Sequence, residues 1–386
     1  MKVLLVGEFS RLHNSLKEGL TALGHEVLLV GTGDLFKNYP VDVNIDSAFF
    51  NKALPLFFRR IILKISGFDI AHFEIARRFK KALPQLKAFD VVQLINEDAL
   101  GIHPKLQIPL LKKLFQQNSS VFLLSCGDDY INISHYLNQK ERYSILTPYF
   151  NNESLAKKYQ YSLKYVSPPY KKMHDFIYKN IKGVIASDID YHIPLKNHDA
   201  YLGLIANPIN INNVKFNPLK IDGKISIFHG VNTISSVRKG NEIFENALKL
   251  IQQKYDSKVS IKTTHSLPYK DYIKVYNNAH IVLDQVYSYD QGYNALEAMA
   301  KGKVVFTGAE QEWLNHYQLK EDSVAINALP NIDKIVEKLE LLILHPEKIE
   351  DISKNARAFI EKEHDYKKIA QKYLDLWSSS ITEFSQ

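Results

Sequence analysis

DQVYSYDQGYNALEAMAKGKVVFTG, residues 284–308, is the stretch that decides the fold. It follows an apolar run at 279–283 that is typical of a buried strand. Gly292 lies in a polar loop, the next apolar run predicts a helix that ends at Gly302, and 304–306 predicts another strand. Together these form a βαβ unit. Ligands bind at the carboxyl ends of such strands in open parallel sheets.

Strand and helix patterns alternate along the rest of the chain. This alternation predicts an α/β fold, with parallel sheets covered by helices on both faces. The predicted strands are residues 2–6, 26–30, 90–95, 121–125, 183–186, 202–206, 225–228, 259–263, 281–283 and 304–306. The main predicted helices are residues 54–65, 106–117, 269–276, 332–344, 349–362 and 365–377.

A chain of 386 residues is long enough for two domains. Between 207 and 223 the alternating pattern gives way to Asn, Pro and Gly, which are typical of a linker. We therefore predict a first domain over residues 1–208 and a second over 209–364. A last helix over 365–386 is expected to cross back to the first domain.

The composition is that of an ordinary soluble protein, with 45% hydrophobic and 24% charged residues. Cys126 is the only cysteine, which excludes a disulfide framework and a cysteine zinc site. No apolar run approaches the roughly 18 residues of a membrane span. Residues 1–7 have the pattern of a strand that enters a glycine turn, unlike a secretory signal. We expect a cytoplasmic protein.

The excess of positive charge is concentrated in residues 52–113, which hold twelve basic and five acidic side chains. Within this segment, residues 54–65 place Leu54, Phe58, Ile61, Ile62 and Ile65 on one helical face. Two interpretations are open. The helix lies on an anionic bilayer at the inner face of the cytoplasmic membrane, or it packs on the protein with a solvated basic face.

Two cations and a glycine, Arg238-Lys239-Gly240, come shortly before a predicted helix. Such cations beside a helix N-terminus suit a pyrophosphate. Glu297, also near a helix start, could accept hydrogen bonds from ribose hydroxyls, and Gly292 would let the backbone approach a phosphate. The plainer interpretation of Arg238-Lys239 is a solvated basic pair. The plainer interpretation of Glu297 is a first-turn residue favoured by the helix dipole. Together in one βα domain they favour a nucleoside diphosphate.

Four segments carry a family resemblance: residues 296–305 (LEAMAKGKVV), 238–240 (RKG), 23–27 (LGHEV) and 206–209 (ANPI). Through them the chain resembles the retaining, nucleotide-sugar-dependent glycosyltransferases of the GT-B fold, family-4 type. The resemblance covers almost the whole chain. It implies two Rossmann-like domains that face each other across a cleft, with a UDP- or GDP-linked sugar as co-substrate and no other cofactor.

The resemblance also implies roles for single residues. Arg238 and Lys239 would hold the donor diphosphate and stabilise the leaving group, and Glu297 matches the second glutamate of an E-x7-E pair, which binds the ribose. Tyr289 stands where the first glutamate is expected, so the sugar is not specified, and Asp284 is a candidate for polar contacts there. The remaining expected donor-site residues are Gly7, Gly230, Asp290, Tyr293 and Asn294.

In the first domain the family often has a histidine after the fourth main strand, and here Asn96-Glu97 takes that place. His13, Asp128 and Asp129 are candidate replacements in strand-end loops. Plainer interpretations are helix capping for the two aspartates and a solvated turn residue for the histidine. No metal is implied, because side-chain cations and helix dipoles hold the diphosphate in this fold. The first turn lacks G-x-G-x-x-G, which disfavours a nicotinamide or flavin dinucleotide.

The expected function is transfer of a sugar to a glycan or lipid-linked acceptor in the synthesis of surface polysaccharide or glycoconjugate. Tyr289 and Asn96 leave two alternatives open, a catalytically silent nucleotide-sugar-binding scaffold and a sugar-nucleotide epimerase of the same architecture. Nucleic acid is not an expected partner, since the basic segment is accompanied by no recognition motif.

Overall fold

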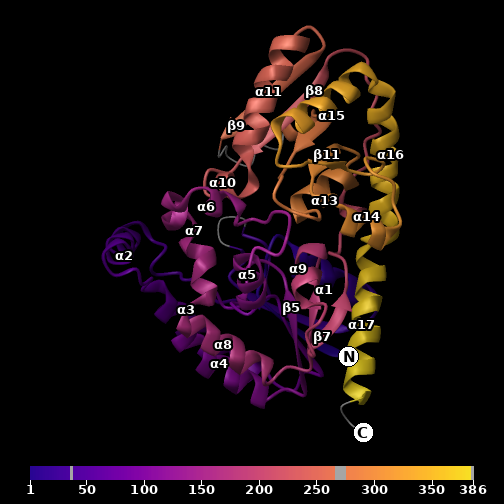
Figure 1. Ribbon diagram of the computed structural model, residues 1–386. Coiled ribbons are helices and arrows are strands. Elements are labelled where there is room, and N and C mark those ends of the chain that lie inside the picture. Colours follow the sequence, from indigo (N-terminus) through magenta and orange to yellow (C-terminus); the bar gives the residue numbers. More distant parts are fainter. Residues whose placement is uncertain (35–37, 266–274, 384–386) are drawn as a thin grey trace.

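The computed structural model describes residues 1–34, 38–265 and 275–383. It contains two parallel sheets, a seven-stranded sheet in the order β3-β2-β1-β4-β5-β6-β7 and a five-stranded sheet in the order β12-β11-β10-β8-β9 (Figure 1). The α/β prediction is confirmed. The first sheet is complete by residue 204 and the second begins at residue 225, so the predicted boundary at 208/209 falls between them and stays a prediction.

The first sheet reproduces the six predicted strands, two with identical bounds and four with ends shifted by one or two residues. Its central strands are fully buried and strongly apolar, as parallel strands covered on both faces must be. Its strands are β1 Lys2–Val6, β2 Glu26–Gly31, β3 Val43–Asn44, β4 Val91–Leu94, β5 Ser120–Ser125, β6 Gly183–Ala186 and β7 Tyr201–Leu204. Its helices are α1 Leu12–Ala22, α2 Ala53–Ser66, α3 Ala71–Ala82, α4 Pro104–Gln116, α5 Tyr130–Leu137, α6 Thr147–Asn151, α7 Ala156–Leu163, α8 Pro168–Tyr178 and α9 Ile189–Leu195.

Two differences from the prediction in the second domain bear on the site. Strand β8 runs three residues further than expected, so Gly230 lies in the strand and not in a loop after it. Helix α13 begins at Tyr293, two residues before the predicted start at Ala295, which puts Glu297 in its second turn. The strands are β8 Ile225–Val231, β9 Val259–His265, β10 Ile281–Leu283, β11 Val304–Thr307 and β12 Ile326–Asn327, and the helices are α10 Ser236–Lys239, α11 Asn241–Tyr255, α13 Tyr293–Ala300, α14 Gln311–Tyr317, α15 Ile332–Leu344 and α16 Pro346–Glu363. Most of the predicted helix 269–276 lies outside the described residues.

Helix α17, Tyr366–Glu383, crosses back to the first domain, as predicted (Figure 1). It packs closely on α1, because a Cβ atom added to Gly19 would lie 2.3 Å from the carbonyl oxygen of Tyr366. Further along, the buried Trp377 donates its Nε1–H to Oε1 of Gln93 at 3.2 Å and contacts the ring of Phe122. The crossing helix therefore completes the hydrophobic core of the first domain.

Candidate functional site

Arg238 and Lys239 lie in the one-turn helix α10, between β8 and α11. Gly240 follows with a φ of 69°, and a Cβ atom added to it would lie 2.3 Å from Cγ2 of Val286. The carbonyl of Lys239 accepts a hydrogen bond from the backbone N–H of Val286 at 3.1 Å. The turn is thus packed against the chain that leaves β10, which brings both cations to the carboxyl end of that strand.

Both cations are paired with carboxylates. Lys239 Nζ lies 2.7 Å from Oδ1 of Asp284. The side chain of Arg238 reaches the first domain. Its two terminal nitrogens donate hydrogen bonds to the two carboxylate oxygens of Asp128, at 2.8 Å and 2.5 Å. Although burial opposes its charge, this contact raises the pKa of Arg238. An incoming diphosphate would therefore compete with Asp128 and Asp284 for these cations.

Gly292 directly precedes α13, with an ordinary φ of −71°. An added Cβ atom would lie 3.9 Å from the amide nitrogen of Gln285 and 4.0 Å from Oδ2 of Asp284. The N-terminus of α13 therefore faces the Lys239–Asp284 pair. Asn294 is exposed in its first turn, and Glu297 is half-buried in the second.

Three other predicted donor residues contact the first domain. The hydroxyl of Tyr289 accepts from the backbone N–H of Arg142 at 3.1 Å, and its ring lies under that guanidinium. Asp290 accepts from a backbone N–H of α9 at 2.9 Å. Tyr293 donates to the carbonyl of Pro208 at 3.0 Å. The second half of the loop 284–292 and the first residue of α13 therefore contact the first domain.

His13 is fully buried, unlike the solvated residue of the plainer interpretation. Burial lowers its pKa to about 3, so the neutral imidazole donates from Nδ1 to the carbonyl of Gly7 at 2.7 Å. Gly7 has a φ of 88°, and an added Cβ atom would lie 2.3 Å from Ile95. Sequence reasoning missed the neighbouring Glu8, whose pKa burial raises to about 7 and which accepts two hydrogen bonds from Asn14. Glu8 comes two residues after the predicted strand 2–6, and this position in a strand-end loop was the available signal.

The loops after β4 and β5 are bonded to each other. Asn96 donates to the carbonyls of Cys126 and Asp128 at 2.9 Å and 3.1 Å. Glu97 is fully buried, and its Oε1 lies 2.7 Å from Nδ1 of His174. This histidine comes from α8, and no local sequence pattern indicated it. Asp129 is the N-cap of α5, as its plainer interpretation has it, and burial raises its pKa to about 7.

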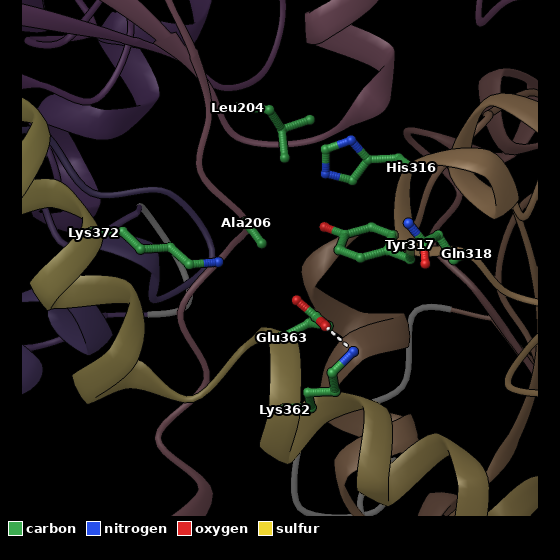
Figure 2. A pocket seen from close by; sticks show the side chains of 8 residues that line it. All are labelled: Leu204, Ala206, His316, Tyr317, Gln318, Lys362, Glu363 and Lys372. Atoms are coloured by element: carbon green, nitrogen blue, oxygen red, sulfur yellow. Dashed lines mark ion pairs between the residues drawn. The ribbon is translucent and has the colours of Figure 1, made fainter.

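A cavity of about 270 Å³ lies elsewhere, where α16 passes into α17 (Figure 2). Lys362 and Glu363 form an ion pair at its edge. It is smaller than usual ligand pockets, and its lining includes no predicted site residue. The lining residues are Leu204, Ala206, His316, Tyr317, Gln318, Lys362, Glu363 and Lys372.

Residues 233–375 match the protein family described as "Glycosyl transferase-like". This segment runs from α10 to the middle of α17 and includes Arg238, Lys239 and Glu297. No curated protein sequence matches the chain.

Solved structures match the chain over nearly its whole length. HepE from Anabaena, in complex with UDP and glucose, is 13% identical, with 98% of this chain and 100% of that chain covered and a TM-score of 0.60. Sucrose-phosphate synthase from Thermosynechococcus elongatus is 14% identical, with 99% and 100% covered and a TM-score of 0.62. TarM from S. aureus, in complex with fondaparinux, alpha-GlcNAc-glycerol and UDP, is 11% identical, with 97% and 99% covered and a TM-score of 0.58. The chain has the GT-B fold that these glycosyltransferases share.

Proposed function

We propose that this protein transfers a sugar from a nucleoside diphosphate sugar to a hydroxyl-bearing acceptor. The observation that carries the proposal is the turn Arg238–Lys239, packed onto the end of β10 and facing the N-terminus of α13. A leaving diphosphate gains negative charge as the sugar departs. Two cations and the positive end of a helix are the groups that stabilise such charge.

UDP is the proposed nucleotide, since HepE and TarM were both solved with UDP bound. GDP remains the alternative that the resemblance leaves open. Glu297 is assigned to the ribose, and retention of the anomeric configuration is part of the proposal, as is the family-4 relationship. The acceptor is a glycan or a lipid-linked sugar bound by the first domain. In that domain Asp128 contacts Arg238, the cation assigned to the leaving diphosphate.

Helix α2 supports a membrane-bound acceptor. None of its residues is buried, and it projects from the body of the first domain (Figure 1). Leu54 and Ile65 are 70% and 82% exposed, beside the exposed Arg60 and Lys64. No helix within the described ranges is long and apolar enough to cross a bilayer. We propose that α2 lies in the interface of an anionic membrane, on its cytoplasmic face.

The membrane proposal predicts weaker vesicle binding when α2 loses its free cations. Arg59 is unsuitable for this test, because it is paired with Asp69 at 2.6 Å. We expect Arg60→Gln with Lys64→Gln to lower partition onto vesicles containing phosphatidylserine roughly thirty-fold, from about 1 kcal/mol per cation. Co-sedimentation measures this. The matched control, Lys348→Gln with Lys354→Gln on α16, should bind as the wild type does, and equal loss in both variants would contradict the proposal.

The donor proposal predicts that a nucleoside diphosphate stabilises the protein. In a thermal-shift panel of UDP, GDP and their sugars, a ligand at a hundred times its Kd adds about 2.7 kcal/mol. Glu297→Ala should diminish this shift, whereas Glu347→Ala, at an exposed glutamate of α16, should keep it. An unchanged shift in Glu297→Ala would remove that residue from the ribose site. Binding without turnover would favour the silent scaffold, and a free or epimerised sugar formed without acceptor would favour the epimerase.

A further inference from the structure

The loop 288–291 of the second domain is held by one aspartate of the first. The carboxylate of Asp190, in the first turn of α9, accepts hydrogen bonds from the backbone N–H of Tyr289 at 3.0 Å and of Asp290 at 3.2 Å. It also accepts from the hydroxyl of Ser288 at 2.6 Å. One side chain thus orients three consecutive residues of the opposite domain.

The contact is reciprocal. Asp290, which is 5% exposed, accepts from the backbone N–H of Ile189 at 2.9 Å, the first residue of α9. Each domain therefore supplies a carboxylate to backbone N–H groups of the other. Such charge-assisted hydrogen bonds are stronger than neutral ones and fix orientation as well as distance.

The loop has little room to move once these bonds are made. A Cβ atom added to Gly308 would lie 2.5 Å from the carbonyl oxygen of Ser288 and 2.6 Å from that of Asp290. Gln291 donates from its side chain to the carbonyl of Gly308 at 2.7 Å. The chain then continues directly into Gly292 and α13. The position of the N-terminus of α13 is therefore tied to α9 of the first domain.

We infer that Asp190 is a positioning residue for the donor site: from the first domain it fixes the loop that sets the place of Gly292 and the N-terminus of α13. The inference rests on the proposed function. It also accounts for Tyr289, because the position where the resemblance expects a sugar-binding glutamate serves here to join the two domains. The donor site is then complete only while the domains are engaged.

The test is titration of UDP into the full-length protein, with donor KM and kcat measured beside it. Asp190→Asn keeps the size of the side chain but replaces one of its two accepting oxygens by an amide NH₂ group, which cannot accept from the loop. Asp190→Asn is therefore expected to raise the Kd for UDP and the donor KM at least tenfold. Ser288→Ala, which removes one bond from the other side, should act in the same direction and less strongly. Asp175→Asn, an exposed aspartate of α8, is the matched control.

The outcomes separate the inference from the function on which it rests. If Asp190→Asn and Ser288→Ala melt earlier but bind UDP with unchanged Kd below their melting temperatures, Asp190 is only structural and the inference is wrong. A wild-type protein that binds no nucleoside diphosphate removes the proposed function and the inference together. Because Ser288→Ala leaves the Asp190 carboxylate and its two backbone donors in place, it keeps the test decisive if Asp190→Asn does not fold.

Discussion

Arg238→Ala is expected to lower the rate of sugar transfer by about 10²–10³, the usual cost of removing one group that stabilises transition-state charge. The guanidinium is paired with Asp128 of the first domain, and the arginine side chain is 22% exposed. Steady-state release of UDP from the donor sugar measures the effect. Arg238→Lys should recover part of the rate, because it keeps the charge and loses the two-pronged geometry.

A substitution at Asp128 distinguishes the chemical role of Arg238 from its role in the ion pair between the domains. Removing Arg238 leaves the Asp128 carboxylate, only 6% exposed, without its cation, and this alone is destabilising. Asp128→Asn breaks the same bridge and keeps the arginine. We expect Asp128→Asn to retain UDP binding, and the double variant to be as slow as Arg238→Ala. Equal loss of UDP binding in both single variants would mean that Arg238 acts only as a bridge.

Trp377→Ala is expected to lower the free energy of unfolding by about 3–5 kcal/mol, as large-to-small changes at buried aromatic sites do. The indole is completely buried between α17 and the first sheet and satisfies the buried amide of Gln93. Urea unfolding followed by circular dichroism measures the loss. Trp377→Phe should lose less, because it keeps most of the apolar contact although it removes the hydrogen bond to Gln93.

The matched control for Trp377 is Gln371→Ala, at an exposed position of the same helix. A surface change of this kind is expected to stay within about 0.5 kcal/mol. If Trp377→Ala also stays within that range, the crossing helix does not contribute to the core of the first domain as described above.

The sequence was sufficient for the architecture because the sheets are parallel and buried on both faces. Strands such as β4 and β5 are short apolar runs, and such runs are visible without any knowledge of contacts. The two-residue strands β3 and β12 were missed, since two residues show no periodicity. Helices α3, α5 to α10 and α14 were also missed, although Asp129 is a candidate helix cap in the sequence.

The candidate site was less accessible to sequence reasoning because its decisive contacts join distant residues. Arg238 and Asp128 are 110 positions apart, and Asp190 and Tyr289 are 99 apart. Each side chain looks like an ordinary surface residue in its own segment. Local patterns placed Arg238, Lys239 and Gly292 shortly before helices, where the structure has them. They contained nothing about which carboxylates would neutralise the cations or which loop would join the domains.

The most direct test of the account is UDP release by the purified wild-type protein from a panel of UDP-sugars, with and without a membrane extract as the source of acceptor. We expect one donor to yield UDP at a rate that the extract increases, with the sugar recovered on an extracted molecule. The absence of UDP release from every donor, under conditions in which UDP itself binds, would contradict the proposal that this protein is a glycosyltransferase.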